Sequence, residues 1–386
     1  MGSISSLWID LYMKIVIYLH SLTFGGTERM ATHLANHFSD TGYEVTVLCN
    51  SDPGYSSYPL RKEISNVVMH VGRKSDNSLI KALRNNFNKI ITFRRELKRI
   101  KPDFVISMSS TSNITSAIGC IGLKLVRVGR EQSYPAAEPP NKKRWTKFRK
   151  LTYRWLDAVV AQTEITRSWL LENTSAKSVA VIQGAVVLPL ERGDPIVVPH
   201  FKSSDKVLLT VGRLSSEKQF DHLIRAFKHA IVRCTGWQLV IVGEGDCRES
   251  LEDLIDELNI SDVVSMPGFV GNAGDWYRIA DLFSLTSAYE GFPNSVVEAL
   301  AHGVPVVSYD CDTGPREMIE DGVNGLLVTP NSVEDLQDSL MLLMGDDDKR
   351  FTAGESAKKI IEKLDISKIC EQWLEVYHQA RTMKKI

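Results

Sequence analysis

Two glutamates, Glu290 and Glu298, flank a Gly-Phe-Pro-Asn turn in the segment SAYEGFPNSVVEALAHGVPVV, which spans 287–307. An apolar run precedes Glu290, and a helix-like stretch carries Glu298. Backbone N–H groups and the helix dipole attract anions where a strand passes into a helix. Carboxylates at such a place would repel a phosphate. They can instead accept hydrogen bonds from the hydroxyl groups of ribose or another sugar. The structural alternative is that Ser295 and Glu298 form a capping box and that Glu290 is a turn residue.

Two cations lie in the segment VGRLSSEKQFDHLI, 211–224: Arg213 follows a strand-like run, and Lys218 precedes a helical one. A guanidinium clamps phosphate oxygens with two parallel hydrogen bonds and an ammonium adds a point charge, so the pair suits a diphosphate. The alternative is a solvated loop in which both side chains face water. Together with the paired glutamates, the two cations favour a ligand that carries both phosphates and sugars, which is a nucleotide sugar.

Two other loops are candidates for contact with such a ligand. HSLTFGGTERM (20–30) places Gly25 and Gly26 between a strand and a helix, where the backbone can approach a ligand closely. Phe269 and Val270 follow another strand-like run and could lie against a nucleobase, although an ordinary loop contact is equally compatible with them. The chain contains no GxGxxG and no GxxxxGK[ST] motif, so an oxidoreductase and a P-loop ATPase lack their signatures.

From Met13 onward the chain resembles the retaining GT-B glycosyltransferases of family GT4. The paired glutamates match the family's Glu-x7-Glu motif with its GFP[NL] interior, and the two cations match its GRxxxxK diphosphate pair. The GGTER loop matches the family's N-terminal glycine loop, and TGPREMIEDGVNGLLV (313–328) resembles the block that follows the glutamates.

The resemblance implies an α/β protein of the GT-B class, with two Rossmann-like domains facing each other across a deep cleft. It implies a retaining hexosyltransferase in which Arg213 and Lys218 stabilise the leaving diphosphate and Glu290 lies near the hydroxyls of the donor sugar. Glu298 would hold the ribose, and Gly26 would close over the diphosphate. The full set of expected donor-binding residues is Gly26, Val270, Phe292, Pro293, Asn294, Ser295 and Glu298.

Members of the family generally work without a divalent cation, so no metal or other cofactor is expected. Asp310-Cys-Asp312 resembles a metal-binding DxD motif, but it follows a strand-like run where the family has a variable turn, and we interpret it as structural. We interpret Asp346, Asp347 and Asp348 as a solvated loop.

The chain departs from the family in the loop GREQSYPAAEPP, 129–140. Many relatives carry a histidine there, near the donor sugar, whereas this chain has Gln132 beside Glu131. We expect Arg130, Glu131 and Gln132 to lie near the sugar or the acceptor. In the front-face mechanism usually proposed for retaining members, the departing phosphate takes the acceptor proton, so an imidazole is dispensable.

The elements that must position these residues read as strands alternating with helices, which predicts parallel, doubly wound sheets. Short apolar runs at 14–19, 44–49, 104–108, 125–129 and 158–162 predict the strands of one domain, and runs at 207–212, 238–243, 262–266, 282–285, 305–308 and 326–328 those of another. Three prolines in 186–205 mark the connection. We therefore predict an acceptor-side domain at 13–190, a donor-binding domain at 201–366, and a terminal helix at 367–386 that packs back on the first domain.

The composition, 43% hydrophobic and 24% charged residues, is typical of a globular protein that does not span a membrane. The cysteines are scattered, which favours free thiols in a reducing compartment. The first 190 residues carry an excess of Lys and Arg and the remainder an excess of Asp and Glu, so the first half is expected to meet an anionic partner. Basic and aromatic residues alternate in 141–156, and the helix predicted at 79–100 adds further cations.

This pattern is typical of a membrane-surface segment, although ordinary solvated helices or a single-stranded nucleic acid site would also fit it. Because no nucleic-acid motif accompanies it, we expect anionic lipids of the inner leaflet as partners and no nucleic acid. The residues expected to contact these lipids are Lys142, Lys143, Arg144, Trp145, Lys147, Arg149 and Lys150.

The sequence thus predicts a cytoplasmic, peripherally membrane-bound glycosyltransferase. It would move a hexose or N-acetylhexosamine, from a UDP-sugar in preference to a GDP-sugar, to a glycan on a polyprenyl diphosphate, as in lipopolysaccharide or other surface-polysaccharide synthesis. The alternative is an inactive GT-B subunit that binds nucleotide and tethers a membrane-associated complex. The intact set of Arg213, Lys218, Glu290 and Glu298 favours the enzyme.

Overall fold

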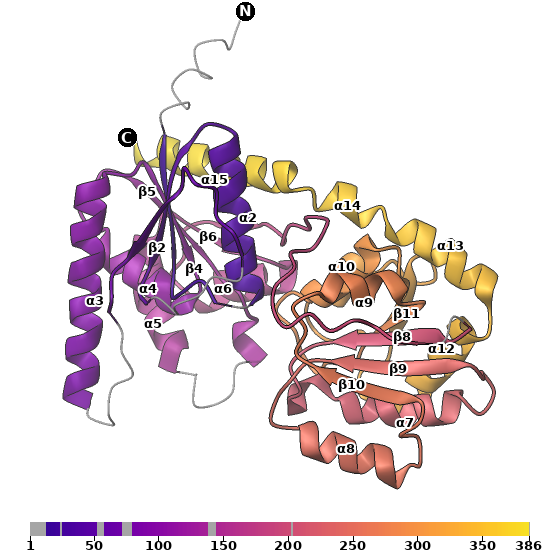
Figure 1. Ribbon diagram of the computed structural model, residues 1–386. Coiled ribbons are helices and arrows are strands. Elements are labelled where there is room, and N and C mark those ends of the chain that lie inside the picture. Colours follow the sequence, from indigo (N-terminus) through magenta and orange to yellow (C-terminus); the bar gives the residue numbers. More distant parts are fainter. Residues whose placement is uncertain are drawn as a thin grey trace, which may run out of the picture. The chain divides into compact units, whose positions relative to one another are not determined.

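The chain forms two compact α/β units in the computed structural model, which describes residues 13–23, 25–51, 58–71, 79–137, 144–201 and 204–385 (Figure 1). The first unit comprises the chain up to Ala185 together with the segment from Ile366 onward, and the second comprises Val186–Asp365. Each unit contains one parallel sheet with helices between its strands, so the prediction of two Rossmann-like domains is confirmed.

The first unit is built on a seven-stranded sheet in the order β3-β2-β1-β4-β5-β6-β7. Its strands are β1 (Lys14–Leu19), β2 (Glu44–Cys49), β3 (Ser65–Val68), β4 (Phe104–Met108), β5 (Val126–Arg130), β6 (Ala158–Ala161) and β7 (Val179–Val181). Central strand β1 pairs in parallel with β2 and β4, with Ile15 opposite Val45 and Phe104. Because helices cover both faces of such a sheet, β4 is buried at every position.

The first unit's helices include a segment from the far end of the chain. They are α2 (Gly26–Asp40), α3 (Leu79–Ile100), α4 (Ser110–Gly119), α5 (Arg144–Thr152), α6 (Glu164–Asn173) and α15 (Ile366–Lys384), with short 3-10 turns η1 (Pro135–Ala137) and η3 (Tyr153–Trp155). Helix α15 contacts α2 and β5, and its Trp373 is fully buried in the core formed with strands β1, β2 and β4. The terminal segment is therefore an integral part of the first unit.

The second unit is built on a six-stranded parallel sheet in the order β10-β9-β8-β11-β12-β13. Its strands are β8 (Lys206–Val211), β9 (Trp237–Val242), β10 (Val264–Gly268), β11 (Leu282–Leu285), β12 (Val306–Tyr309) and β13 (Gly325–Val328). Its helices are α7 (Phe220–Ala230), α8 (Arg248–Glu257), α9 (Ala273–Ile279), α10 (Asn294–Ala301), α11 (Pro315–Met318), α12 (Val333–Met344), α13 (Asp347–Ala357) and α14 (Ile360–Lys363), with the 3-10 turn η4 (Ser216–Lys218).

The proline-containing segment predicted as a connection is attached to the second unit. The Gly193 N–H donates to the Gly271 carbonyl at 2.8 Å, and the Gly271 N–H donates to the Pro195 carbonyl at 2.7 Å. Because Gly271 has no side chain, the two backbones can approach this closely: a Cβ on Gly271 would lie 1.9 Å from the Gly193 oxygen. The segment is thus held against the loop after β10.

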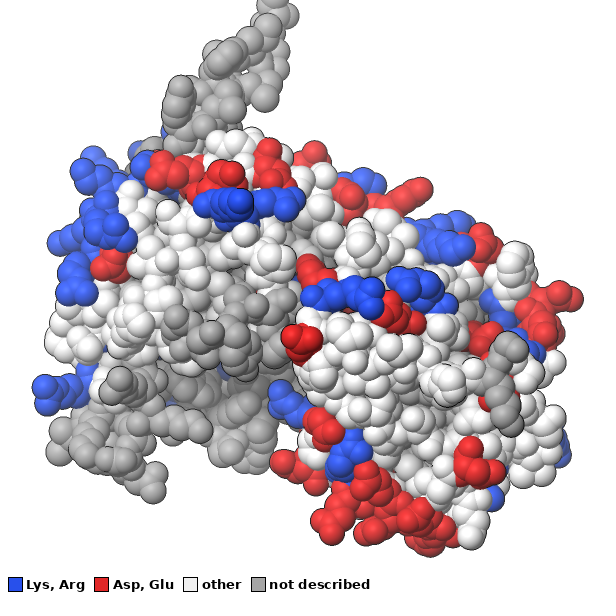
Figure 2. All heavy atoms as spheres, in the orientation of Figure 1, with Lys and Arg blue, Asp and Glu red and all other residues white. Residues whose placement is uncertain are grey.

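The two units differ in surface charge. Lys and Arg side chains gather along α3 of the first unit, whereas Asp and Glu gather over α8 of the second (Figure 2). Among the residues that the structure describes, no helix is both long enough and apolar enough to span a membrane.

Candidate functional site

The loop after β8 carries both predicted cations. Arg213 is exposed, two residues beyond the end of β8, and Lys218 ends the 3-10 turn η4 just before α7. The Gly212 N–H donates to the Val242 carbonyl at 3.0 Å, and a Cβ on Gly243 would lie 1.8 Å from the Gly212 oxygen. The loops after β8 and β9 therefore pack backbone to backbone, which fixes the base of the cation loop.

Lys218 and Glu290 form an ion pair with 2.6 Å between Nζ and Oε1. Their side chains are 20% and 11% exposed, so the pair is largely buried. The Ser287 hydroxyl also donates to Glu290 Oε1, at 2.7 Å. Since β8 and β11 are neighbours in the sheet, the loops that follow them are adjacent, and the structure joins one of the predicted cations to one of the predicted carboxylates.

Two further contacts tie these loops together. The Thr286 hydroxyl donates to the Lys218 carbonyl at 2.8 Å, and the Ala288 N–H donates to the Glu217 carbonyl at 2.8 Å. The backbone that carries Lys218 is thus fixed against the loop after β11, and its ammonium is held by Glu290, which is the kind of preorganisation that electrostatic catalysis requires.

The turn between the two glutamates leads directly into α10. This helix begins at Asn294, and its N-cap residue is Pro293, which provides no side-chain cap. Ser295 lies inside the first turn, so the capping box suggested as an alternative for Ser295 and Glu298 does not form. Glu298 is 6% exposed, one turn further along the helix, whereas Asn294 and Ser295 are half-buried.

A second loop supports this turn from the side. Gly314 has φ +101°, and a Cβ there would lie 2.4 Å from Pro293 Cδ. The Thr313 hydroxyl donates to the Glu290 carbonyl. Cys311 lies beside Glu290, and burial, followed by the Glu290 charge, raises the pKa of the Cys311 thiol to about 12. The loop after β12 therefore holds Glu290 and Pro293 in place.

Replacing Gly314 by alanine should disturb this support. We expect the free energy of unfolding of the second unit to fall by roughly 1–3 kcal/mol, because alanine is strained at this φ and its Cβ would press on Pro293. We also expect weaker nucleotide binding, since the turn before α10 would move. Urea unfolding and calorimetric titration with UDP measure the two effects.

Gly322→Ala is the matched control, because Gly322 has φ +76° but nothing lies within 4 Å of the place that a Cβ would occupy there. It should show the loss of stability alone. Equal nucleotide affinity in the two variants would contradict a supporting role for Gly314.

Two expected donor-binding residues have buried side chains. Val270 is 6% exposed and belongs to the core of the second unit, and Phe292 is also 6% exposed. Phe269, immediately before Val270, is 40% exposed. Of the two residues expected to lie against a base, Phe269 therefore has the exposed side chain and Val270 the buried one.

The acidic motifs have structural partners. Asp310 accepts a hydrogen bond from Arg316 Nε at 3.0 Å, in agreement with its interpretation as structural. Asp347 and Asp348 are exposed as expected, but they begin α13 instead of forming a loop: the Asp346 side chain caps this helix by accepting from the Lys349 N–H at 2.9 Å, and Asp347 pairs with Lys206 at 2.6 Å. Across the described ranges, His, Cys, Asp and Glu nowhere form a group of three or more that could hold a metal ion.

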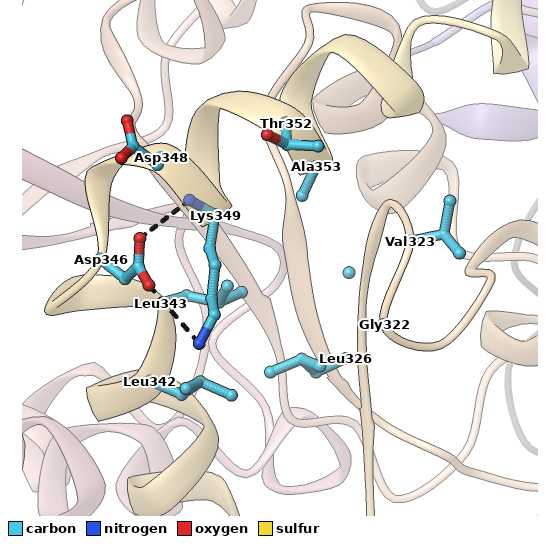
Figure 3. Close-up of a pocket in the computed structure, with 11 residues that line it drawn as sticks. Gly322, Val323, Leu326, Leu342, Leu343, Asp346, Asp348, Lys349, Thr352 and Ala353 are labelled. Carbon is cyan, nitrogen blue, oxygen red and sulfur yellow. Dashed lines mark hydrogen bonds and ion pairs between the residues drawn. The ribbon is translucent and has the colours of Figure 1, made fainter.

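The second unit also has a pocket of about 470 Å³ that lies away from Lys218 and Glu290 (Figure 3). It is lined by the turn before β13, by α12 and by α13, including Leu342, Asp346 and Lys349. The pocket opens near Gly325, where β13 begins, and so lies at the opposite edge of the sheet from the loops after β8 and β11. Its position separates it from the predicted chemistry.

In the first unit, the glycine loop lies between β1 and α2 as predicted. Gly26 is the first residue of α2, and Gly25 precedes it with φ +157°. A Cβ on Gly25 would lie 2.5 Å from Glu28 Oε2. The small residues therefore allow the Glu28 side chain to fold back over the helix N-terminus, and burial raises the pKa of Glu28.

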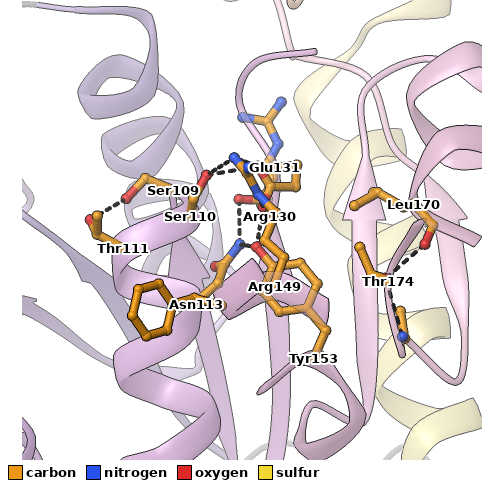
Figure 4. Close-up of polar contacts among 12 residues, drawn as sticks. Ser109, Ser110, Thr111, Asn113, Arg130, Glu131, Arg149, Tyr153, Leu170 and Thr174 are labelled. Atoms are coloured by element: carbon orange, nitrogen blue, oxygen red, sulfur yellow. Dashed lines mark hydrogen bonds and ion pairs between the residues drawn. The ribbon is translucent and has the colours of Figure 1, made fainter. Parts of the chain in front are cut away.

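Arg130, the last residue of β5, and Glu131, which follows it, belong to a buried polar network (Figure 4). Arg130 and Glu131 are each 1% exposed. Glu131 Oε1 accepts from Arg149 Nε at 3.1 Å, its Oε2 accepts from Ser110 at 2.9 Å, and it also accepts from the Tyr153 hydroxyl. Burial raises the pKa of Tyr153 well above its usual value, so this hydroxyl remains a donor.

Arg130 binds two amide side chains. Its Nη1 donates to Gln132 Oε1 at 3.0 Å and its Nη2 to Gln162 Oε1 at 2.7 Å. Gln162 Nε2 in turn donates to the Gln132 carbonyl at 2.9 Å. Burial lowers the pKa of Arg130 to about 9, which still leaves it charged at neutral pH.

These contacts bear on two expectations. Arg130 and Glu131, which were expected near the sugar or the acceptor, are buried and bind other residues of the first unit, whereas Gln132 is half-buried. Arg149 was expected to contact lipids, but it is fully buried against Glu131. Of the other residues expected to contact lipids, Lys147 and Lys150 are exposed and Trp145 is half-buried, whereas Lys142, Lys143 and the Arg144 side chain lie outside what the structure describes.

Comparisons with known proteins agree with this arrangement. The family model described as Glycosyltransferase Family 4 matches residues 24–188, and the model described as Glycosyl transferases group 1 matches residues 196–360. Together the two models account for most of the chain.

Among relatives, a Campylobacter jejuni GalNAc-alpha-(1->4)-GalNAc-alpha-(1->3)-diNAcBac-PP-undecaprenol alpha-1,4-N-acetyl-D-galactosaminyltransferase is 28% identical over 370 residues, which covers 96% of this chain and 99% of the relative. A Salmonella typhimurium lipopolysaccharide 1,6-galactosyltransferase is 27% identical over 336 residues, 84% of this chain and 87% of the relative. Among solved structures, Anabaena Alr3699/HepE in complex with UDP and glucose matches with a TM-score of 0.77 at 21% identity, over 97% of this chain and 100% of that one, so the fold is shared.

Proposed function

Since this chain belongs to glycosyltransferase family 4 and has the GT-B fold, we propose that it transfers a hexose or N-acetylhexosamine, with retention of the anomeric configuration, from a UDP-sugar to a glycan carried on a polyprenyl diphosphate. The observation that carries the proposal is the ion pair between Lys218 and Glu290. It joins Lys218, a cation that can bind phosphate, to Glu290, a carboxylate that can bind sugar hydroxyls, at the adjacent ends of β8 and β11.

The expected roles follow from the chemistry of these side chains. The exposed Arg213 and the half-buried Lys218 receive the charge that develops on the diphosphate as the bond from C1 of the sugar to its oxygen breaks. Glu290 accepts hydrogen bonds from hydroxyls of the transferred sugar, and Glu298 from the ribose. The acceptor oxygen bonds to C1 on the face that the diphosphate leaves, and its proton passes to the departing phosphate oxygen.

The choice of donor and acceptor is supported by what similar proteins use. Alr3699/HepE was solved with UDP and glucose, which supports a UDP-sugar. The Campylobacter relative acts on an undecaprenol-linked glycan and the Salmonella relative on lipopolysaccharide, which supports a lipid-linked acceptor. No divalent cation is expected to be needed, because Arg213 and Lys218 supply the positive charge at the diphosphate.

We further propose that the first unit docks on the anionic inner face of the cell membrane through α3 and α5, which both pack against α4. Phe148 and Leu151 on α5 are 47% and 57% exposed and lie beside the exposed Lys147 and Lys150. On α3, Phe87 and Ile91 are 65% and 49% exposed. Apolar side chains that flank cations in this way can enter the headgroup region while the cations bind lipid phosphates.

Replacing Phe148 and Leu151 together by serine should weaken binding to anionic vesicles about tenfold or more, because two exposed apolar side chains would no longer enter the bilayer. Sedimentation with phosphatidylglycerol vesicles at two salt concentrations measures this. Leu342→Ser, at a 46% exposed leucine of the second unit, should leave binding unchanged. Equal binding of the wild type to neutral and anionic vesicles would contradict the role of the cations.

The function is tested by nucleotide release. Purified protein is incubated with a panel of UDP- and GDP-sugars and short-chain polyprenyl-diphosphate glycans, with and without EDTA. We expect release of UDP from one donor, unchanged by EDTA, and its loss in Arg213→Ala and Glu290→Gln. Tight binding of a nucleotide without turnover on any acceptor would instead indicate the inactive tethering subunit.

A further inference from the structure

The first unit has a pocket of about 310 Å³ beside α6 and the loop that follows β5. It is lined by Tyr134 from that loop and by Glu164, Ile165, Ser168, Trp169 and Glu172 from α6. Residues spaced by four along a helix share a face, so Glu164, Ser168 and Glu172 form a polar stripe beside an apolar stripe of Ile165 and Trp169. The pocket thus presents aromatic surface next to hydrogen-bonding groups.

This combination selects an uncharged, hydroxyl-rich ligand. An aromatic face packs against the apolar face of a pyranose ring, and carboxylate and hydroxyl oxygens accept hydrogen bonds from sugar hydroxyls. Glu164 forms an ion pair with Arg167, with 3.3 Å between its Oε2 and Arg167 Nη1, whereas Glu172 is exposed near the end of the helix. The two carboxylates would repel the phosphates of a nucleotide or of a lipid diphosphate.

The loop that carries Tyr134 is held in place from beneath. Gln162, at the end of β6, donates to the Gln132 carbonyl at 2.9 Å, and Arg130 donates to the Gln132 side chain at 3.0 Å. The 3-10 turn η1, which follows Tyr134, contacts α6. Trp169, which also lines the pocket, is half-buried against the core beneath α6. Both rings therefore belong to supported elements, and little ordering is needed to bind a ligand.

The pocket also begins at the edge of the sheet where the chemistry is expected. Glu164 opens α6 just after β6, and Tyr134 lies two residues beyond Gln132, the residue after β5 that is expected near the sugar or the acceptor. Ligands of parallel sheets bind at this edge. A glycan whose reacting end lies near Gln132 can extend along α6.

We propose that this pocket is an acceptor subsite that binds an uncharged sugar of the acceptor glycan, one or more residues behind the sugar that receives the transfer. The inference rests on the proposed function for the identity of the glycan as acceptor. Trp169 and Tyr134 hold the sugar ring, and Ser168 and Glu172 hold its hydroxyls. The enzyme would thereby distinguish acceptors by the length of their glycan.

Saturation-transfer NMR without donor tests binding directly. The probes are α-linked N-acetylgalactosamine mono- and trisaccharides and maltotriose, with inorganic pyrophosphate as competitor. We expect a trisaccharide to bind at millimolar concentration, pyrophosphate not to displace it, and Trp169→Ala to weaken binding about tenfold. Leu171→Ala, at a 45% exposed leucine of the same helix outside the pocket, should bind like the wild type.

Tyr134→Ala and Glu172→Lys extend the test should Trp169→Ala fail to fold, because both positions lie at the surface of the pocket. The proposal is overturned if no probe binds, if pyrophosphate displaces the sugar, or if the pocket variants bind as tightly as the wild type. Because this experiment involves no turnover, an inactive tethering subunit could still pass it. Conversely, an active enzyme whose KM for long acceptors is unchanged in Trp169→Ala would refute the subsite alone.

Discussion

Replacing Lys218 by alanine should lower kcat for nucleotide release by about 10²–10³-fold, which is the usual effect of removing one preorganised group that stabilises charge in a transition state. The ammonium lies 2.6 Å from Glu290 in a largely buried position. Its removal takes a positive charge from the departing diphosphate and leaves the Glu290 carboxylate without its cation. Both effects raise the energy of a transition state that gains negative charge.

Lys206→Ala is the matched control for this experiment. Lys206 also forms an ion pair of 2.6 Å, with Asp347, but it lies at the start of β8 instead of beyond its end. The substitution should leave kcat and KM unchanged. Lys218→Arg keeps the charge and should retain more activity than Lys218→Ala. A kcat for Lys218→Ala close to that of the wild type would rule out a catalytic role for the ammonium.

Replacing Arg149 by methionine should lower the free energy of unfolding of the first unit by about 3–5 kcal/mol, because Glu131 would remain buried without its cation. Both side chains of this pair are 0% exposed. The double variant Glu131→Gln/Arg149→Met should recover a large part of the loss, since it removes both charges. Urea unfolding of the full chain, followed by circular dichroism, measures the three values.

The same variants distinguish a structural Arg149 from a lipid-binding one. If Arg149 contacted lipid phosphates, Arg149→Met would weaken vesicle binding and leave stability unchanged. Arg61→Ala removes an exposed pair with Asp40 in the same unit and should change neither quantity measurably.

The central strands of both sheets could be predicted from the sequence because each is a short run of apolar residues buried on both faces. The edge strands β3 and β7 could not. β3 has the sequence Ser-Asn-Val-Val with two exposed residues, and β7 contains only Val179–Val181. A strand at the edge of a sheet packs against fewer neighbours and so leaves a weaker apolar pattern.

Arg149 shows why a charge pattern alone does not identify a surface. In α5 the apolar Phe148 and Leu151 are exposed while Arg149 is buried, the reverse of the usual order for a helix. The reason lies 18 residues earlier in the chain, in the isolated Glu131 at the end of a buried strand. A lone acid at such a position is the signal that the sequence offered, since a buried carboxylate needs a partner.

The alternative for Ser295 and Glu298 was wrong for a local reason. A capping box requires Ser295 at the N-cap, but α10 begins at Asn294, with Pro293 before it. The two-residue difference between Pro293 and Ser295 at the N-cap moves Glu298 away from the helix start. Contacts such as Thr313 to Glu290 and Gly314 to Pro293 could not be predicted, because they join segments that only the completed sheet brings together.

The position of α15 has a consequence for synthesis on the ribosome. The first unit emerges first, yet part of its core is supplied by Ile369, Trp373 and Tyr377, which are translated after the whole second unit. The apolar surface of α2 that α15 covers therefore remains exposed in the nascent first unit until the second unit has been translated. Chaperone binding to stalled chains should persist until α15 leaves the exit tunnel, and a fragment ending at Ala185 should aggregate.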